Sequence, residues 1–350
     1  MEFGLQFFPS IGPDEKSAQD YFAESLRLVD EADDLGYKSL RIVEHYFRPY
    51  GGYSPNPIVF LAAAAMRSRK ARLLTGAVLP VFNNPMKLAG EIGMLDAISG
   101  GRLEVGFARA FLPHEFAKFG INVNESRARF DEGIEQIRLL LENETVSHAG
   151  RFHTIDKVSS LPRPTQKPRP PFWVAALATA ETFEFAGRMG YGVMGIPLGG
   201  AQLRSLMETY REAWRAAGHP GKGRVMLAFH MYCHESSQAA AEIAREPINK
   251  YLQAVVSSAT EWEGELSSKD YPNYDKIIAA LRAETFETQL EKGCIWVGSP
   301  KDIREQIADY LGVVGDFEIA SLQANFHNLS YDLASASARL FSKEVMPHFS

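Results

Sequence analysis

The stretch RIVEHYF, residues 41–47, reads as a buried strand that ends on two titratable side chains. An apolar run leads into Glu44 and His45, and two aromatic residues follow. An imidazole at such a place is either a hydrogen-bonded core histidine or part of a functional site. The stretch alone leaves both readings open, so the rest of the chain must decide between them.

Seven other short apolar runs resemble this one, and a helix-like segment follows each of them. Such alternation predicts a parallel sheet, and near-continuous hydrophobicity predicts strands that are covered on both faces. Eight units in 350 residues predict an α/β fold of the (β/α)8 TIM barrel type with insertions. The eight predicted strands cover residues 2–8, 38–45, 72–80, 102–109, 171–177, 191–196, 224–232 and 317–323.

The expected helices leave one long gap, at residues 251–293. We interpret this gap as a late insertion into a single barrel domain spanning 1–350, either a lid or a decoration. The proline-rich segment 161–171 is either a domain linker or a stiff surface connection, and we prefer the second because a strand follows at once. The expected helices span 18–35, 58–67, 86–98, 127–142, 180–189, 202–217, 237–249 and 301–311.

Composition narrows the classes of partner. The net charge is −6 and no block of Lys or Arg stands out, so we do not expect a nucleic-acid partner. No apolar run approaches the roughly 18 residues that span a bilayer, and the N-terminus lacks the pattern of a signal peptide. Two cysteines, Cys233 and Cys294, give no disulfide framework, so we expect a cytoplasmic protein.

Two motifs suggest chemistry that their context does not support. GYGVMG, residues 190–195, matches a dinucleotide fingerprint, but its glycines follow a helix and precede a strand, the reverse of the required order. HMYCH, residues 230–234, offers two histidines and a cysteine. In a strand the cysteine would face away from both histidines, so we expect no metal site and a pocket-lining role for His230.

The strand ends carry the more promising residues, because chemistry in a barrel sits at the carboxyl ends of its strands. His45 lies at one such end, and Arg109 lies at another. An arginine that closes a buried strand needs an anion, and phosphate suits its rigid fork of donors. Thr179 is a plausible cap of the helix that begins at Ala180, where free N–H groups form a phosphate seat, although most capping threonines bind no ligand.

These residues together resemble the bacterial luciferase-like family of flavin-dependent monooxygenases. The resemblance rests on EHYF (44–47), on the run from Ala77 to Arg109, on WVAALATAETFEFAGRMGYG (173–192) and on WVGSPKDIREQI (296–307). It implies a (β/α)8 barrel with His45 beside the flavin ring. It also implies that Arg109, Thr179 and Ala180 hold the flavin phosphate. The strand TGAV (75–78), with Gly76 and Ala77, corresponds to the place where the family often carries a non-proline cis peptide under the ring.

The resemblance further implies the reaction and the partners. Reduced FMN from a separate flavin reductase would react with O2 to give a flavin hydroperoxide, which oxygenates a small organic substrate while His45 handles protons. A homodimer is expected, through two helices rich in small residues. Ala108 and Tyr46 depart from the light-emitting relatives, so we do not expect luminescence. Candidates for the wall of the substrate pocket are Phe7, Phe47, Phe111, His230 and Phe326.

Three alternatives remain open at this point. The same barrel could serve a deazaflavin-dependent dehydrogenase that transfers hydride without oxygen. The chain could also be a non-catalytic flavin-binding subunit, although the presence of His45 and Arg109 argues against this. A metal-dependent barrel hydrolase is disfavoured by the poor set of ligands.

Overall fold

The computed structural model describes residues 1–197, 199–264 and 268–349 of the chain. Eight parallel strands run in the order β11-β1-β2-β3-β4-β7-β8-β9, and β9 pairs with β11 to close the barrel. They are the eight strands expected from the sequence, so the predicted barrel is confirmed. Their bounds are β1 Glu2–Phe7, β2 Ser39–Ile42, β3 Arg72–Val78, β4 Leu103–Phe107, β7 Phe172–Ala175, β8 Gly192–Gly195, β9 Val225–Cys233 and β11 Ile319–Gln323.

Helices surround the barrel, and local sequence signals set several of their ends. Asn84 caps α3, where its side chain accepts a hydrogen bond from the Met86 N–H, and Pro85 occupies the first helical position. Gly190 ends α6 in the left-handed conformation with φ of 68°, which confirms that GYGVMG leads out of a helix into β8. The surrounding helices are α1 Ala18–Ala32, α2 Pro57–Arg67, α3 Pro85–Ser99, α5 Ser126–Glu142, α6 Ala180–Met189, α7 Gly200–Ala216, α11 Pro300–Val314 and α12 Tyr331–Glu344.

The barrel interior combines an apolar cluster with buried polar side chains. The cluster consists of Leu74, Trp173, Met194, Met226 and Ile319, and the Trp173 indole N–H donates to the buried Glu104 carboxylate at 2.6 Å. Inward positions of neighbouring strands carry Gln6, Arg41 and Ser321. Polar side chains inside a barrel need hydrogen-bond partners or a ligand.

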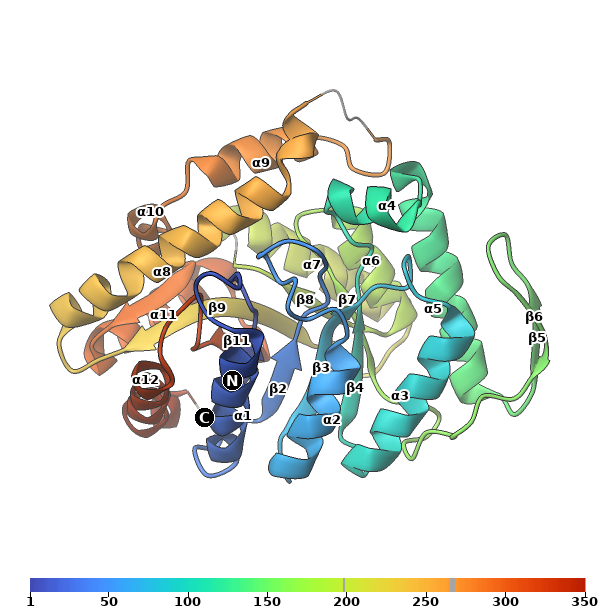
Figure 1. Cartoon of the computed structure of the whole chain (residues 1–350), viewed down its shortest axis with the longest axis horizontal. Coiled ribbons are helices and arrows are strands. Elements are labelled where there is room, and N and C mark those ends of the chain that lie inside the picture. Colours follow the sequence, from blue (N-terminus) through green and yellow to red (C-terminus); the bar gives the residue numbers. More distant parts are fainter. Residues whose placement is uncertain (198, 265–267, 350) are drawn as a thin grey trace.

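The late insertion lies over this mouth. It comprises the end of α8 (Ser237–Ser258), the 3₁₀ turn η2 (Thr260–Glu263), α9 (Tyr274–Arg282) and α10 (Phe286–Glu291). In Figure 1, α8, α9 and the short helix α4 (Pro113–Phe119) lie above the strands. Helix α8 runs nine residues beyond the predicted end at 249, because Leu252, Val255 and Val256 bury its continuation.

Several smaller elements were not expected from the sequence. Strand β10 (Ile295–Gly298) pairs with the far half of β9, and a hairpin of β5 (Val146–Ala149) and β6 (Thr154–Val158) projects from the side of the barrel (Figure 1). The proline-rich segment packs against α3 through Gln166 and Asp96. Within the described residues, we find no helix of the length and apolarity that crossing a membrane requires.

Candidate active site

His45 lies just beyond the end of β2, at the carboxyl mouth of the barrel, and is 8% exposed. Its Nδ1 lies 3.1 Å from Oε1 of Glu115, which comes from α4 and is completely buried. The same carboxylate oxygen accepts the backbone N–H of Tyr46 at 2.9 Å. With Nδ1–H donating to Glu115, the Nε2 atom of His45 remains available to accept or donate a proton.

Glu115 was not singled out from the sequence. It is 70 residues from His45, and only the path of the chain through β3, α3 and β4 brings the two together. Its Oε2 atom has no hydrogen-bond partner among the described residues. A buried carboxylate beside an imidazole fixes the ring orientation and stabilises the imidazolium. The short helix α4 therefore completes the site that β2 begins.

Glu44, whose role the sequence left open, takes part in a separate network. It accepts hydrogen bonds from the Tyr46 hydroxyl, from the Leu79 N–H at 3.1 Å and from the Asn83 side chain at 2.9 Å. Burial nevertheless raises the pKa of Glu44 to about 8, since desolvation outweighs these donors. Glu44 thus ties the end of β2 to the loop after β3 and does not contact His45 in this network.

Aromatic rings enclose His45 on several sides. Phe8, Tyr50 and Phe111 have ring centroids 5.7, 5.2 and 6.0 Å from the imidazole. Tyr251 of α8 contacts Phe8 and Tyr50 from above, with its ring 4.4 Å from that of His230. These contacts make an apolar enclosure in which a proton-transfer group is shielded from water.

The structure brings only part of the predicted pocket wall together. Phe111 contacts His45, and His230 packs against Phe326 at 5.4 Å. Phe7 packs instead on Phe60 of α2, and Phe47 is 59% exposed. Strand alternation explains the position of Phe7, because it turns Phe7 outward and its neighbour Phe8 inward. The sequence already contained this signal.

Gly76 and Ala77, at the end of β3, are joined by a cis peptide bond. Both residues are buried. The Gly76 carbonyl accepts a hydrogen bond from Arg41 at 3.0 Å, and a Cβ on Gly76 would lie 2.0 Å from Nε of Arg41. Glycine is therefore required here by the arginine side chain that crosses beneath it.

Arg109 follows β4, and the late insertion contacts it. Its Nη1 donates to the Asp270 carbonyl at 3.0 Å, and its guanidinium lies 4.8 Å from the ring centroid of Tyr271. In the described part of the chain, Arg109 makes no ion pair with a carboxylate. Thr179 directly precedes α6, and its side chain makes no capping hydrogen bond. The Thr182 N–H donates to the Thr179 carbonyl at 3.0 Å, so the N–H groups of Ala180 and Glu181 are the candidates for an anion.

The insertion is tied to the loop after β4 by direct hydrogen bonds. Trp262 donates its indole N–H to the Phe111 carbonyl at 2.8 Å, and the Tyr271 hydroxyl donates to the Ala110 carbonyl at 2.8 Å. His114 on α4 and the Arg48 guanidinium both reach the Ser258 carbonyl at the end of α8. These contacts make the insertion a cover over the site.

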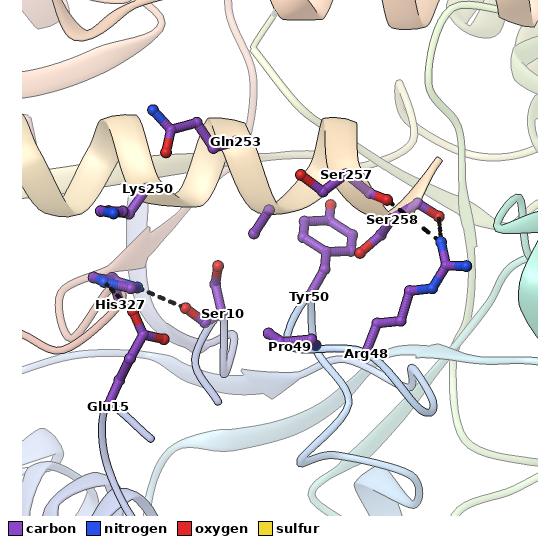
Figure 2. A pocket seen from close by; sticks show the side chains of 11 residues that line it. Ser10, Glu15, Arg48, Pro49, Tyr50, Lys250, Gln253, Ser257, Ser258 and His327 are labelled. Carbon is purple, nitrogen blue, oxygen red and sulfur yellow. Dashed lines mark hydrogen bonds and ion pairs between the residues drawn. The ribbon is translucent and has the colours of Figure 1, made fainter. Parts of the chain in front are cut away.

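A pocket of roughly 270 Å³ lies beside the aromatic residues that enclose His45. Figure 2 shows it between α8 and the loops that follow β1, β2 and β11, with Tyr50 in its wall. Since Tyr50 also contacts the His45 ring, one aromatic side chain separates the pocket from the enclosure. The polar residues that line it are Ser10, Glu15, Arg48, Lys250, Gln253, Ser257, Ser258 and His327.

The mouth of the barrel fits a flavin in three respects. Small side chains occupy inward positions at the tops of the strands, and Ala108, Ala175 and Ala228 remain partly accessible there. Arg109 and the uncapped start of α6 supply donors for a phosphate on adjacent strands β4 and β7. Nε of Arg41 and Nε2 of His230 are buried and find no hydrogen-bond partner in the part of the chain that the structure describes, so each could serve a ligand.

A closed (β/α)8 barrel with a polar site at the carboxyl ends of its strands is the architecture of a TIM-barrel enzyme. The family profile described as luciferase-like monooxygenase matches residues 1–316, and the chain belongs to that family of oxidoreductases. Its eight strands and its late insertion over the mouth are those expected from the resemblance.

Three relatives indicate the range of the family around this chain. The crystal structure of the monooxygenase RslO1 from Streptomyces bottropensis is 41% identical, with a TM-score of 0.90 and 100% of both chains covered. The oxygenase component of a flavin-dependent trigonelline monooxygenase from Acinetobacter baylyi is 29% identical over 100% of this chain and 96% of that protein. The oxygenating constituent of 3,6-diketocamphane monooxygenase from Pseudomonas putida, solved with FMN, shares the fold at 24% identity and a TM-score of 0.83, covering 99% and 98% of the chains.

Proposed function

We propose that the protein is the oxygenase component of a two-component monooxygenase, which uses reduced FMN and O2 to oxygenate a small organic molecule. The observation that carries this proposal is the pair of His45 and Glu115 in an aromatic enclosure, with Arg109 and the start of α6 on the same face of the barrel. The names of two relatives support it, since one is an oxygenase component and another was solved with FMN.

Arg109 and the backbone N–H groups at the start of α6 are the proposed phosphate site. Arg109 is a rigid fork of donors, and its present partners in the insertion are a carbonyl and an aromatic face. Neither neutralises its charge, so a phosphate would bind without breaking an ion pair. The isoalloxazine ring would extend from there toward Gly76, Ala77 and His45.

Bound reduced FMN supplies the electrons that activate O2. His45 would deliver or remove the proton that oxygen transfer requires, through the Nε2 atom that Glu115 leaves free. Glu115 would hold the ring in that orientation and stabilise its protonated form. Phe8, Tyr50 and Phe111 would orient the substrate against the imidazole and exclude water.

The insertion is the proposed lid. Its contacts with the Phe111 carbonyl, with Ala110 and with Arg109 support this proposal, because they join it to the loop beside the proposed flavin site. Since Arg109 is held by the backbone of Asp270, entry of a flavin phosphate would exchange this contact for a charged one. Binding of the phosphate would thus change a contact of the lid. The lid would close over the enzyme once flavin is bound and would exclude water from the reaction.

We further propose a separate flavin reductase, a cytoplasmic setting and a homodimer that pairs through α2 and α3. Four apolar side chains on these helices are 41–68% exposed: Val59, Met66, Met94 and Ile98. Clusters of this kind mark association surfaces. Val59→Glu combined with Met94→Glu should convert a dimer to a monomer in light-scattering chromatography, whereas Val313→Glu, at an exposed site on α11, should not.

The function is tested by supplying photoreduced FMN and ¹⁸O₂ to the purified protein with candidate substrates. Incorporation of one ¹⁸O atom into a product, dependent on the protein, is the expected result. Binding of reduced FMN without any protein-dependent change in its reoxidation would favour the non-catalytic subunit. Hydride transfer from a reduced deazaflavin, with no use of O2, would favour the dehydrogenase.

A further inference from the structure

Arg41 is a buried cation in the upper interior of the barrel. It belongs to β2, is 8% exposed, and points inward, where its Nη1 donates to Gln6 Oε1 of β1 and its Nη2 to the Gly76 carbonyl at 3.0 Å. Its Nε is buried, and no described residue forms a hydrogen bond with it. Both groups that accept its hydrogen bonds are neutral, so nothing in this set balances its charge.

No carboxylate forms an ion pair with Arg41 in the part of the chain that the structure describes. The two buried acids next to the mouth have other partners, since Glu44 binds Tyr46 and Asn83 and Glu115 binds His45. Arg72 on the neighbouring strand shows the usual arrangement, with Glu2 and Glu104 as ion-pair partners. Arg41 therefore differs from the other arginine on this inner face of the sheet.

An unpaired buried charge is costly, and a guanidinium gives up its proton with difficulty. Burial lowers the pKa of Arg41 to about 10, which still leaves the side chain charged at neutral pH. The ionisable groups that act on it most are the hydroxyls of Tyr251 and Tyr50, both of which are neutral at that pH. The cost is recovered only when an anion binds next to the guanidinium.

The surroundings of Arg41 can receive such an anion. Tyr50 and Tyr251, whose hydroxyl oxygens lie 3.4 Å apart, and the unpartnered Nε2 of His230 are further polar groups on the same side of the aromatic enclosure. Gly76 packs directly against the Arg41 side chain, since a Cβ there would lie 2.0 Å from Nε. Arg41, the two tyrosine hydroxyls and His230 therefore form a buried polar cluster with one net positive charge at the inner end of the proposed active site.

We propose that Arg41 is the anion-binding residue of this polar cluster and that it holds a planar, delocalised oxyanion of the reacting ligands. Two sources share this chemistry. One is the N1–C2–O edge of reduced isoalloxazine in its anionic form, and the other is a carboxylate, enolate or phenolate of the substrate. The inference rests on the proposed function for the first source, whereas the second needs only an acidic ligand in the barrel.

Gln6→Glu is the sharpest variant, because it places a carboxylate on Arg41 while keeping the size of the side chain. It should preserve or raise the melting temperature, since it pairs the buried charge. It should also abolish the preference for anionic ligands, because the charge is then neutralised. Gln323→Glu is the matched control: Gln323 pairs with Gln6 in register, but its amide donates to the Phe8 carbonyl. An acid there would take up a proton, lower the melting temperature and leave the preference intact.

Two ratios of dissociation constants are measured for the wild type, for the two glutamine variants, and for Arg41→Met and Arg41→Lys. The first arm is the ratio of dissociation constants for oxidised and dithionite-reduced FMN, and the second is the ratio for benzamide and benzoate with flavin-free protein. In the wild type at least one ratio should exceed about ten, the factor that corresponds to about 1.4 kcal/mol. Arg41→Lys should keep most of that ratio, while Gln6→Glu and Arg41→Met should bring it close to one.

Loss of the FMN ratio would assign the anion to the flavin, and loss of the benzoate ratio would assign it to the substrate. The proposal is overturned if the wild type shows neither preference, or if both preferences survive in Gln6→Glu. Should Arg41→Met fail to fold, Gln6→Glu gives the answer by itself. Failure of the wild type to bind FMN at all would refute the proposed function, and the benzoate arm would still test Arg41.

Discussion

The ends of β2 and β4 both carry a candidate functional residue, but the partners of these two residues differ. His45 at the end of β2 is hydrogen-bonded to the carboxylate of Glu115, and aromatic side chains contact it on several sides. Arg109 after β4 contacts a carbonyl and the face of Tyr271, and makes no ion pair with a carboxylate among the described residues. The proposed catalytic end thus has its partners within the protein, whereas the proposed binding end has a charge that no ion pair balances among the described residues.

This difference makes separable predictions, because one end should control chemistry and the other should control binding. His45→Ala should cause the largest loss, a fall in oxygenation of roughly 10²- to 10⁴-fold, the range of a missing acid–base group. The affinity for reduced FMN should change little, since the phosphate site is untouched. Single-turnover kinetics with prebound reduced FMN measure the first quantity, and anaerobic fluorescence titration measures the second. An unchanged rate of oxygen transfer would remove His45 from the proposed mechanism.

Arg109→Ala should show the opposite pattern. We expect the dissociation constant for FMN to rise by roughly 100-fold, since a charge-assisted contact with a phosphate is lost, about 2–3 kcal/mol. Riboflavin, which lacks the phosphate, should bind the wild type and the variant alike, and this comparison is the control. Equal weakening of FMN and riboflavin would show that Arg109 acts on the fold or the ring and not on the phosphate.

Glu115→Gln should have a smaller effect, which sharpens the description of the β2 end. The amide oxygen can still accept the hydrogen bonds from His45 and Tyr46, but the negative charge that favours the imidazolium is gone. Turnover should fall roughly tenfold, a loss of about 1.4 kcal/mol. Single-turnover oxygenation at the wild-type rate would mean that Glu115 is a structural partner only.

Glu44 gives the smallest expected effect on the reaction and a clear effect on stability. Because its pKa is raised from 4.5 to about 8 in the folded protein, its contribution to stability is complete below about pH 4.5 and is lost as the pH rises to 8. Denaturant unfolding across this range should show a loss of up to a few kcal/mol in the wild type. Glu44→Gln should flatten that dependence. The interpretation fails if the variant keeps the slope of the wild type.

The same comparison shows what the sequence can and cannot predict. The strands were found because each is a short apolar run with its own end signals, and His45 and Arg109 were found because each closes such a run. Glu115 could not be found in this way, since its partnership with His45 depends on a contact across 70 residues. Phe8 could have been chosen over Phe7 from strand alternation alone.

Other features depend on which residues surround a side chain in the folded protein, and a local sequence pattern does not contain this information. Arg41 stands in the quoted stretch itself, yet only the folded barrel shows that its neighbours are Gln6 and the Gly76 carbonyl and not an acid. The contacts between the insertion and Arg109 are of the same kind, because they join residues 161 positions apart. The sequence left the insertion as lid or decoration, and its hydrogen bonds over the mouth now support the lid.

The most direct test of the central claim is the affinity of the purified protein for reduced FMN, compared with that for a reduced deazaflavin, in the wild type and in Arg109→Ala. The account predicts that reduced FMN binds the wild type more tightly than the deazaflavin does, and that Arg109→Ala removes most of this affinity. Tight deazaflavin binding without FMN binding, or FMN binding that does not depend on Arg109, would contradict it.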